Sequence, residues 1–113
     1  MKLGRVFSVI CVSCALLVGS PASADTLQKV GKIKSIFVSG GANYGFRITI
    51  YSASGEDQLS DCFYHFAYVN SADDNYQTKL SALLVAYAQQ SALNVTISKE
   101  SDNSCHIVEF GTV

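Results

Sequence analysis

The stretch SADDNYQTKLSALLVAYAQQS, residues 71–91, decides the fold. Its large apolar side chains recur at i, i+4, i+7, i+8 and i+11, a spacing that lines one face of an α-helix. These side chains are Tyr76, Leu80, Leu83, Leu84 and Tyr87. Ser71 and Asp74 approximate a capping box, which predicts that the helix begins there. No comparable helical period occurs in the rest of residues 25–113, so we expect strands that bury their apolar faces against this helix and against each other.

The N-terminal 24 residues have the pattern of a secretory signal. Lys2 and Arg5 precede an apolar run over residues 6–18, and the small residues Ala22 and Ala24 follow it. This pattern predicts cleavage after Ala24, and the run is shorter than the 18–20 or so residues that a membrane span needs. We therefore expect a signal peptide at 1–24, one domain at 25–113, and a secreted or periplasmic protein with no membrane span after cleavage.

Removal of the signal leaves two cysteines, Cys62 and Cys105. An even count in an oxidising compartment predicts one disulfide between them. The same 89 residues carry six Lys and Arg against nine Asp and Glu, a formal charge of −3. A mildly acidic exported domain is a poor candidate for binding nucleic acid, whose phosphates favour basic partners.

Five segments have strand patterns, and the helix lies between the third and the fourth of them. The predicted strands are residues 29–38, 44–52, 62–69, 93–99 and 105–112. In the first, Ile33 and Phe37 share a face, and the neighbouring apolar residues predict a bulge near Ser35. In the second, Phe46, Ile48 and Ile50 alternate with polar residues; the third is aromatic on both faces.

This order matches the OB-fold, a five-stranded Greek-key barrel, and the class is mainly β with one α-helix. In that barrel the third and fifth strands are parallel neighbours, so cysteines that open these two strands can form a bridge. An open antiparallel sheet packed on one helix is the alternative that the same order allows.

The residues typical of catalytic and metal sites do not converge. His65 and His106 each follow a cysteine, but on strands their spacing directs the four side chains to different faces, and oxidised cysteines bind no metal. No strained nucleophile turn or activated cysteine accompanies the histidines. We therefore predict neither an enzyme nor a metal or cofactor site.

Tyrosine is the residue type that points to binding. Tyr44, Tyr51, Tyr64 and Tyr68 lie on predicted strands or at their ends. Their rings and hydroxyl groups suit sugar stacking or protein contacts, although such residues also fill the core and rim of a small barrel. These four tyrosines are the candidate contacts for a glycan or a partner.

Several short motifs resemble the B subunits of A-plus-five-B bacterial toxins, in particular the subtilase-cytotoxin B-like group. They are Gly31-x-Ile33, the aromatic third strand, Leu80-Ser81-Ala82-Leu83-Leu84, Asn94-Val95-Thr96-Ile97 and the late Cys105. The resemblance implies an OB-fold subunit that assembles as a homopentamer, binds host glycans without catalysis, and accompanies a catalytic A chain. Sialic-acid-binding members have serine and tyrosine where this sequence has Val30 and Lys99, so their sugar pocket does not carry over; Lys99 joins the candidate contacts.

Two hypotheses follow. The first is a secreted glycan-binding subunit of the toxin B type. The second is a small interaction protein of the bacterial envelope, an inhibitor or an assembly factor with the same fold.

Overall fold

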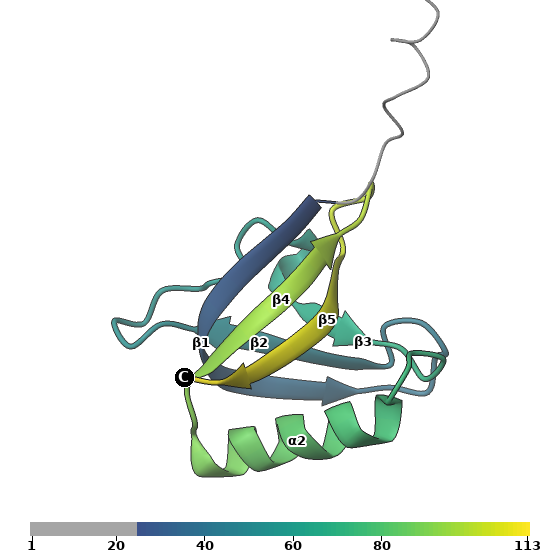
Figure 1. Ribbon diagram of the computed structural model, residues 1–113. Helices are drawn as coiled ribbons and strands as arrows, with labels where there is room; N and C mark the ends of the chain where they lie inside the picture. The colour runs from purple at the N-terminus through teal and green to yellow at the C-terminus, as the bar shows by residue number, and fades with distance from the viewer. Residues whose placement is uncertain (1–24) are drawn as a thin grey trace, which may run out of the picture.

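The computed structural model describes residues 25–113, and the predicted signal peptide lies outside the described residues. Within them the chain forms a five-stranded sheet and one α-helix (Figure 1). The elements in chain order are β1 (Asp25–Val38), β2 (Phe46–Tyr51), the 3-10 helix η1 (Phe63–His65), β3 (Ala67–Val69), α2 (Tyr76–Gln89), β4 (Leu93–Lys99) and β5 (Cys105–Thr112). The predicted order of five strands with the helix between the third and fourth is confirmed, and β4 and β5 have the predicted bounds.

Each strand pairs with two others, so the strand order β1-β2-β3-β5-β4 closes on itself. The long strand β1 makes this possible because its first half pairs with β4 and its second half with β2. The register of β1 on β2 shifts between Ile33 and Ser35, where the sequence predicts a bulge. After the shift Phe37 is 48% exposed while Ile33 is fully buried, so the prediction that they share a face is wrong. The bulge adds a residue and reverses the facing of the residues that follow it.

The core lies inside the ring of strands and under the helix. Phe46, Ile48 and Ile50 of β2 are buried as predicted, because alternate residues of a strand face the same side. The other buried apolar residues are Ile33, Leu59, Cys62, Ala67, Val69, Leu83, Ala86, Leu93, Val95, Ile97, Cys105 and Ile107.

The α-helix begins later than the capping box predicts. Tyr76 is its first residue, and the preceding Asn75 has a left-handed backbone (φ 58°) and no side-chain cap bond. The carboxylate of Asp73 instead accepts the backbone N–H of Asn70 at 2.8 Å, which fixes the loop before the helix. At the other end, Gln90 is left-handed (φ 54°), and Ser91 N–H donates to the Ala86 carbonyl at 3.0 Å, a Schellman-type stop.

One edge of the predicted apolar face of the helix is exposed. Leu83 is fully buried, and Tyr76 and Leu80 pack against the core. Leu84, however, is 45% exposed, and Ala86 takes its place as the second buried residue of α2. The buried stripe is thus narrower than the sequence spacing predicts, because only one side of the helix meets the sheet.

The predicted third strand, residues 62–69, is only partly a strand. Its first half is η1, where Tyr64 (φ 54°) and His65 (φ 62°) have a positive φ that no strand allows. Only Ala67–Val69 pairs, antiparallel to β2 and parallel to β5. The disulfide between Cys62 and Cys105 is present, with 5.6 Å between the Cα atoms, and the parallel pairing of the third and fifth strands is confirmed.

Candidate functional site

The turn between β1 and β2 places Tyr44 at one end of the sheet. Ser39 N–H donates to the Gly45 carbonyl at 2.8 Å and closes the turn. Tyr44 has a left-handed backbone (φ 61°), and its N–H donates to Asn70 Oδ1 at 2.9 Å, so the turn is tied to the end of β3. Residues other than glycine seldom adopt this conformation, and where they do the position often serves a function.

From Tyr44 a chain of aromatic contacts runs through β3 to β5. The Tyr44 ring meets the edge of Tyr68 with centroids 4.4 Å apart, and it lies 6.3 Å from Phe66. Tyr68 in turn stacks in parallel on the imidazole of His106 at 4.8 Å. Burial raises the pKa of Tyr68, which is only 4% exposed. Tyr68 is therefore the base of this cluster and Tyr44 part of its rim.

The loop between β4 and β5 reaches the same rim through Asp102. Its Oδ1 accepts the Ser104 N–H at 3.0 Å and the Ser104 hydroxyl at 2.7 Å, while Oδ2 lies 3.4 Å from the Tyr44 hydroxyl. The side-chain and backbone hydrogen bonds from Ser104 lower the pKa of Asp102, which is exposed and ionised at neutral pH. A carboxylate thus lies beside Tyr44 at the rim of the cluster, where it can accept hydroxyl hydrogen bonds.

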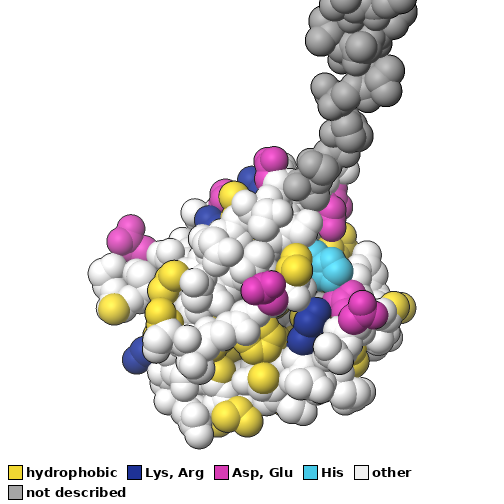
Figure 2. All heavy atoms as spheres, in the orientation of Figure 1, with side chains coloured by type: hydrophobic (Ala, Val, Ile, Leu, Met, Phe, Trp, Pro, Cys, Tyr) yellow, Lys and Arg dark blue, Asp and Glu magenta, His cyan; other side chains and the backbone are white. Residues whose placement is uncertain are grey.

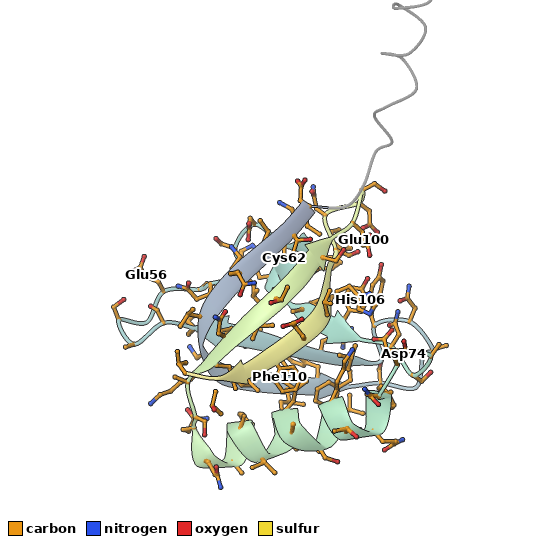
Figure 3. All side chains as sticks on the ribbon, viewed as in Figure 1. Glu56, Cys62, Asp74, Glu100, His106 and Phe110 are labelled. Carbon is orange, nitrogen blue, oxygen red and sulfur yellow. A yellow bond between two sulfur atoms is a disulfide. The ribbon has the colours of Figure 1, made fainter. Side chains whose placement is uncertain are left out.

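Two aromatic rings at the outer end of the cluster are exposed to solvent. Phe63 is 44% and Tyr64 74% exposed, and their ring centroids lie 4.2 Å apart. Tyr64 also lies nearly parallel to Phe66 at 6.2 Å. The Cys62–Cys105 disulfide and the 2.8 Å bond from Phe63 N–H to the Asn103 carbonyl hold this segment against the β4–β5 loop. We call Tyr44, Phe63, Tyr64, Phe66 and Tyr68 the aromatic site. Cys62, which directly precedes Phe63, is labelled in Figure 3.

Arg47 on β2 supports the inner side of the aromatic site. Its guanidinium carbon lies 5.2 Å from the Phe66 ring centroid and 5.7 Å from that of Phe37. Cation–π contacts of this kind hold aromatic rings in place. Its buried Nε has no hydrogen-bond partner within the part of the chain that the structure describes.

Three of the five predicted contacts, Tyr44, Tyr64 and Tyr68, belong to the aromatic site, and two do not contact its rings. The ring of Tyr51 is covered by Lys34, whose Nζ lies 4.3 Å from the ring centroid. Lys99 is 4.0 Å from Asp61, a carboxylate that also pairs with Lys29 at 3.2 Å. The sequence reasoning did not select Phe63 and Phe66, although both lie in the aromatic run CFYHFAYV that it singled out.

The two histidines pair with carboxylates rather than with each other. His65 Nδ1 lies 2.8 Å from Asp57 Oδ2, and its side chain is 61% exposed. His106 Nε2 lies 2.7 Å from Asp73 Oδ2. Over residues 25–113 no three His, Cys, Asp or Glu side chains come together as metal ligands. Among the same residues no helix is both long and apolar enough to cross a membrane.

Comparison with known proteins adds no relative. No protein-family model, curated protein or solved structure matches the chain.

Proposed function

We propose that this chain is a secreted, non-catalytic binding subunit that recognises cell-surface glycans through the aromatic site. The observation that carries the proposal is the exposed pair Phe63 and Tyr64 on a backbone segment with positive φ. Exposed large rings at such a position cost stability and are typical of binding surfaces. The C–H faces of a sugar stack on aromatic rings, and the Asp102 carboxylate beside the Tyr44 hydroxyl can accept sugar hydroxyl hydrogen bonds.

The place of the site in the sheet supports the same proposal. We infer that the closed strand order, with the helix between β3 and β4, is an OB-fold with Greek-key topology. OB-folds bind oligosaccharides and oligonucleotides with the loops that follow their first and fourth strands. In this chain those two loops meet where the Tyr44 hydroxyl approaches Asp102. A domain with a formal charge of −3 favours the sugar over the nucleic acid.

Glycan-array binding tests this proposal, with the change Tyr64→Ala. Loss of the ring should weaken binding by about tenfold or more, whereas Tyr64→Phe, which keeps the ring, should bind within a few-fold of the parent protein. Tyr51→Ala, outside the aromatic site, is the control and should bind normally. Absence of binding to every glycan by a correctly folded protein would contradict the proposal.

We further propose that the subunit assembles as a homopentamer that can accompany a catalytic A chain. Support comes from α2, where Leu84 and Tyr87, which lie outside the groove described below, are 45% and 38% exposed. Exposed apolar side chains on one helix suit a contact between copies. Light scattering of the purified protein should give the mass of five copies. Leu84→Glu should lower this mass, whereas Ser60→Glu, at an exposed loop position away from α2, should not. A single-copy mass for the parent protein would exclude the ring.

A further inference from the structure

A long groove separates α2 from β5, away from the rings of the aromatic site. Two adjoining hollows of about 630 and 520 Å³ share Thr78, Ala82 and Phe110 as lining residues. Figure 2 shows this face, with hydrophobic side chains near the middle and a histidine to the right of them, where basic and acidic side chains are also in view. In Figure 3 Phe110 lies over the helix, and Asp74 and His106 lie toward its first turn.

The strand wall of the groove is the edge of β5 rather than one of its faces. Seven consecutive residues, 106–112, line the two hollows. Successive side chains of a strand point to opposite faces, so an unbroken run of lining residues means that the groove follows the backbone. β4 pairs along the whole of β5 on one side, whereas on the other side β3 pairs only with Cys105 and His106. Within residues 25–113, β5 beyond His106 therefore has no strand partner on its second side.

The helix wall is a stripe of mostly short side chains. Thr78, Ala82, Val85 and Gln89 recur at spacings of four, three and four, which places them on one flank of α2. Leu84 does not line the groove, since it lies on the opposite flank. The small side chains at Thr78 and Ala82 leave room beside the strand edge for another backbone.

The charge of the groove differs between its ends. Asp73, Asp74 and Glu109 line the end near the start of α2 together with Lys79 and His106. The other end is lined by uncharged residues, including Gln89, Ser91 and Thr112. A basic side chain is therefore favoured at the first end only.

We propose that the groove binds an extended peptide segment of a partner protein, which adds a strand to the free edge of β5. Main-chain hydrogen bonds to residues 107–112 supply affinity, and the segment's alternate apolar side chains enter the space between β5 and Ala82. Its one basic residue lies beside Asp74 and Glu109. An extended segment of about six residues, about 20 Å long at 3.3 Å per residue, matches the free edge. This inference is independent of the proposed glycan binding, because it uses none of the aromatic-site residues.

The test is fluorescence anisotropy with a labelled synthetic peptide, Lys-Val-Thr-Val-Ser-Val-Thr, titrated with the purified protein. We expect saturable binding that Ala82→Tyr weakens by at least about tenfold, because the new ring fills the groove. Ala88→Tyr makes the same change at an exposed helix position outside both hollows and should leave binding unchanged. The same peptide N-methylated at alternate residues should bind at least about tenfold more weakly, since it cannot pair as a strand.

The acidic end is tested by Asp74→Lys, an exposed loop position. This change should weaken the Lys-ended peptide and favour a Glu-ended peptide, while Glu56→Lys, in a distant loop, should alter neither. Absence of peptide binding, or binding that Ala82→Tyr leaves intact, overturns the proposal. A further outcome of light scattering is that the protein self-associates and that, of these variants, only Ala82→Tyr is monomeric. That result would overturn the proposal, because a second copy of the chain would then occupy the groove. Glycan binding should be the same for all these variants, so failure here and failure of the proposed glycan function are distinguishable.

Discussion

His106 and Asp73 connect the last strand to the loop that leads into the helix: Nε2 of the imidazole lies 2.7 Å from Oδ2 of the carboxylate. The same carboxylate oxygen accepts the Asn70 N–H, and the same imidazole stacks on Tyr68. One contact therefore positions both the base of the aromatic site and the entry to α2. Its two side chains are 26% and 12% exposed, so solvent weakens the pairing less than it would at the surface.

A double-mutant cycle measures this coupling. His106→Phe keeps a ring against Tyr68 but removes the bond to Asp73, and it should lower the free energy of unfolding by about 1–2 kcal/mol. Asp73→Asn should cost a similar amount, and the double variant should cost less than the sum of the two. Urea denaturation of the four proteins gives the values. Additive losses, within about 0.5 kcal/mol, would show that the two residues act independently.

Loss of the disulfide should destabilise the whole domain. Cys62 and Cys105 are 43 positions apart, and the bridge restricts the unfolded chain by closing this loop. On the chain-entropy account its removal costs about 4 kcal/mol. We expect Cys62→Ala/Cys105→Ala to shift the urea midpoint of unfolding accordingly. A midpoint unchanged from the oxidised parent would contradict the expectation, and the parent protein treated with reductant serves as a second measurement.

The pH dependence of stability should have an acid and an alkaline limb. Burial alone would raise the pKa of Asp61, but the hydrogen bond and charge of Lys29 and the charge of Lys99 lower it below 3.8. A carboxyl group whose pKa is lowered on folding stabilises the fold at pH values above its ordinary pKa. This contribution disappears as the pH falls through the folded-state pKa. Burial raises the pKa of Tyr68 above 10.0, so its contribution is present below that pH and disappears as the pH rises through the raised value.

Urea unfolding between pH 2 and pH 11 or so checks both limbs. Asp61→Asn should flatten the loss of stability below the ordinary carboxyl pKa of about 4, and Tyr68→Phe should flatten the loss above about pH 10. Each variant should leave the opposite limb unchanged. If the loss of stability at low pH stays as steep in Asp61→Asn, other carboxylates cause it. Asp102, whose pKa is also lowered, would then be the next residue to test.

The sequence predicts the strands that alternate and fails where the backbone departs from regular geometry. β4 has its predicted bounds because period-two alternation is a direct record of one buried face. The segment 62–66 has the aromatic content of a strand, but the positive φ angles at Tyr64 and His65 fold it into η1. The residue types give little sign of this: histidine is found at positive φ more often than most residues, but tyrosine is not. The loop contacts that fix it, such as Phe63 N–H to the Asn103 carbonyl, are long-range.

The candidate site shows the same division. Composition selects tyrosine, and three of the four tyrosines chosen come together. The disulfide and the β4–β5 loop determine which rings are exposed, and these are contacts between residues far apart in the sequence. Composition therefore includes Tyr51, which lies outside the site, and omits Phe63, which belongs to it. The free edge of β5 was equally beyond the sequence, because it depends on β3 being only three residues long.

Gly31 provides a test of how tightly the sheet is closed at the centre of β1. A Cβ placed there would lie 2.6 Å from the Tyr51 carbonyl oxygen and 2.8 Å from Ile50 Cγ2. The oxygen belongs to the backbone and cannot rotate away, so the strands must separate to admit a methyl group. We expect Gly31→Ala to lower the free energy of unfolding by about 1–3 kcal/mol, measured by urea denaturation.

Gly111 is the matched control, since it also lies in a strand and a Cβ there would meet no atom within 4 Å. Gly111→Ala should leave stability unchanged or raise it by up to about 1 kcal/mol, because alanine reduces the freedom of the unfolded chain. Equal effects at the two positions would mean that the close approach of β1 and β2 at Gly31 is absent in solution. A loss confined to Gly31→Ala would instead show that a side chain is excluded at this point, where β1 leaves β4 and begins to pair with β2.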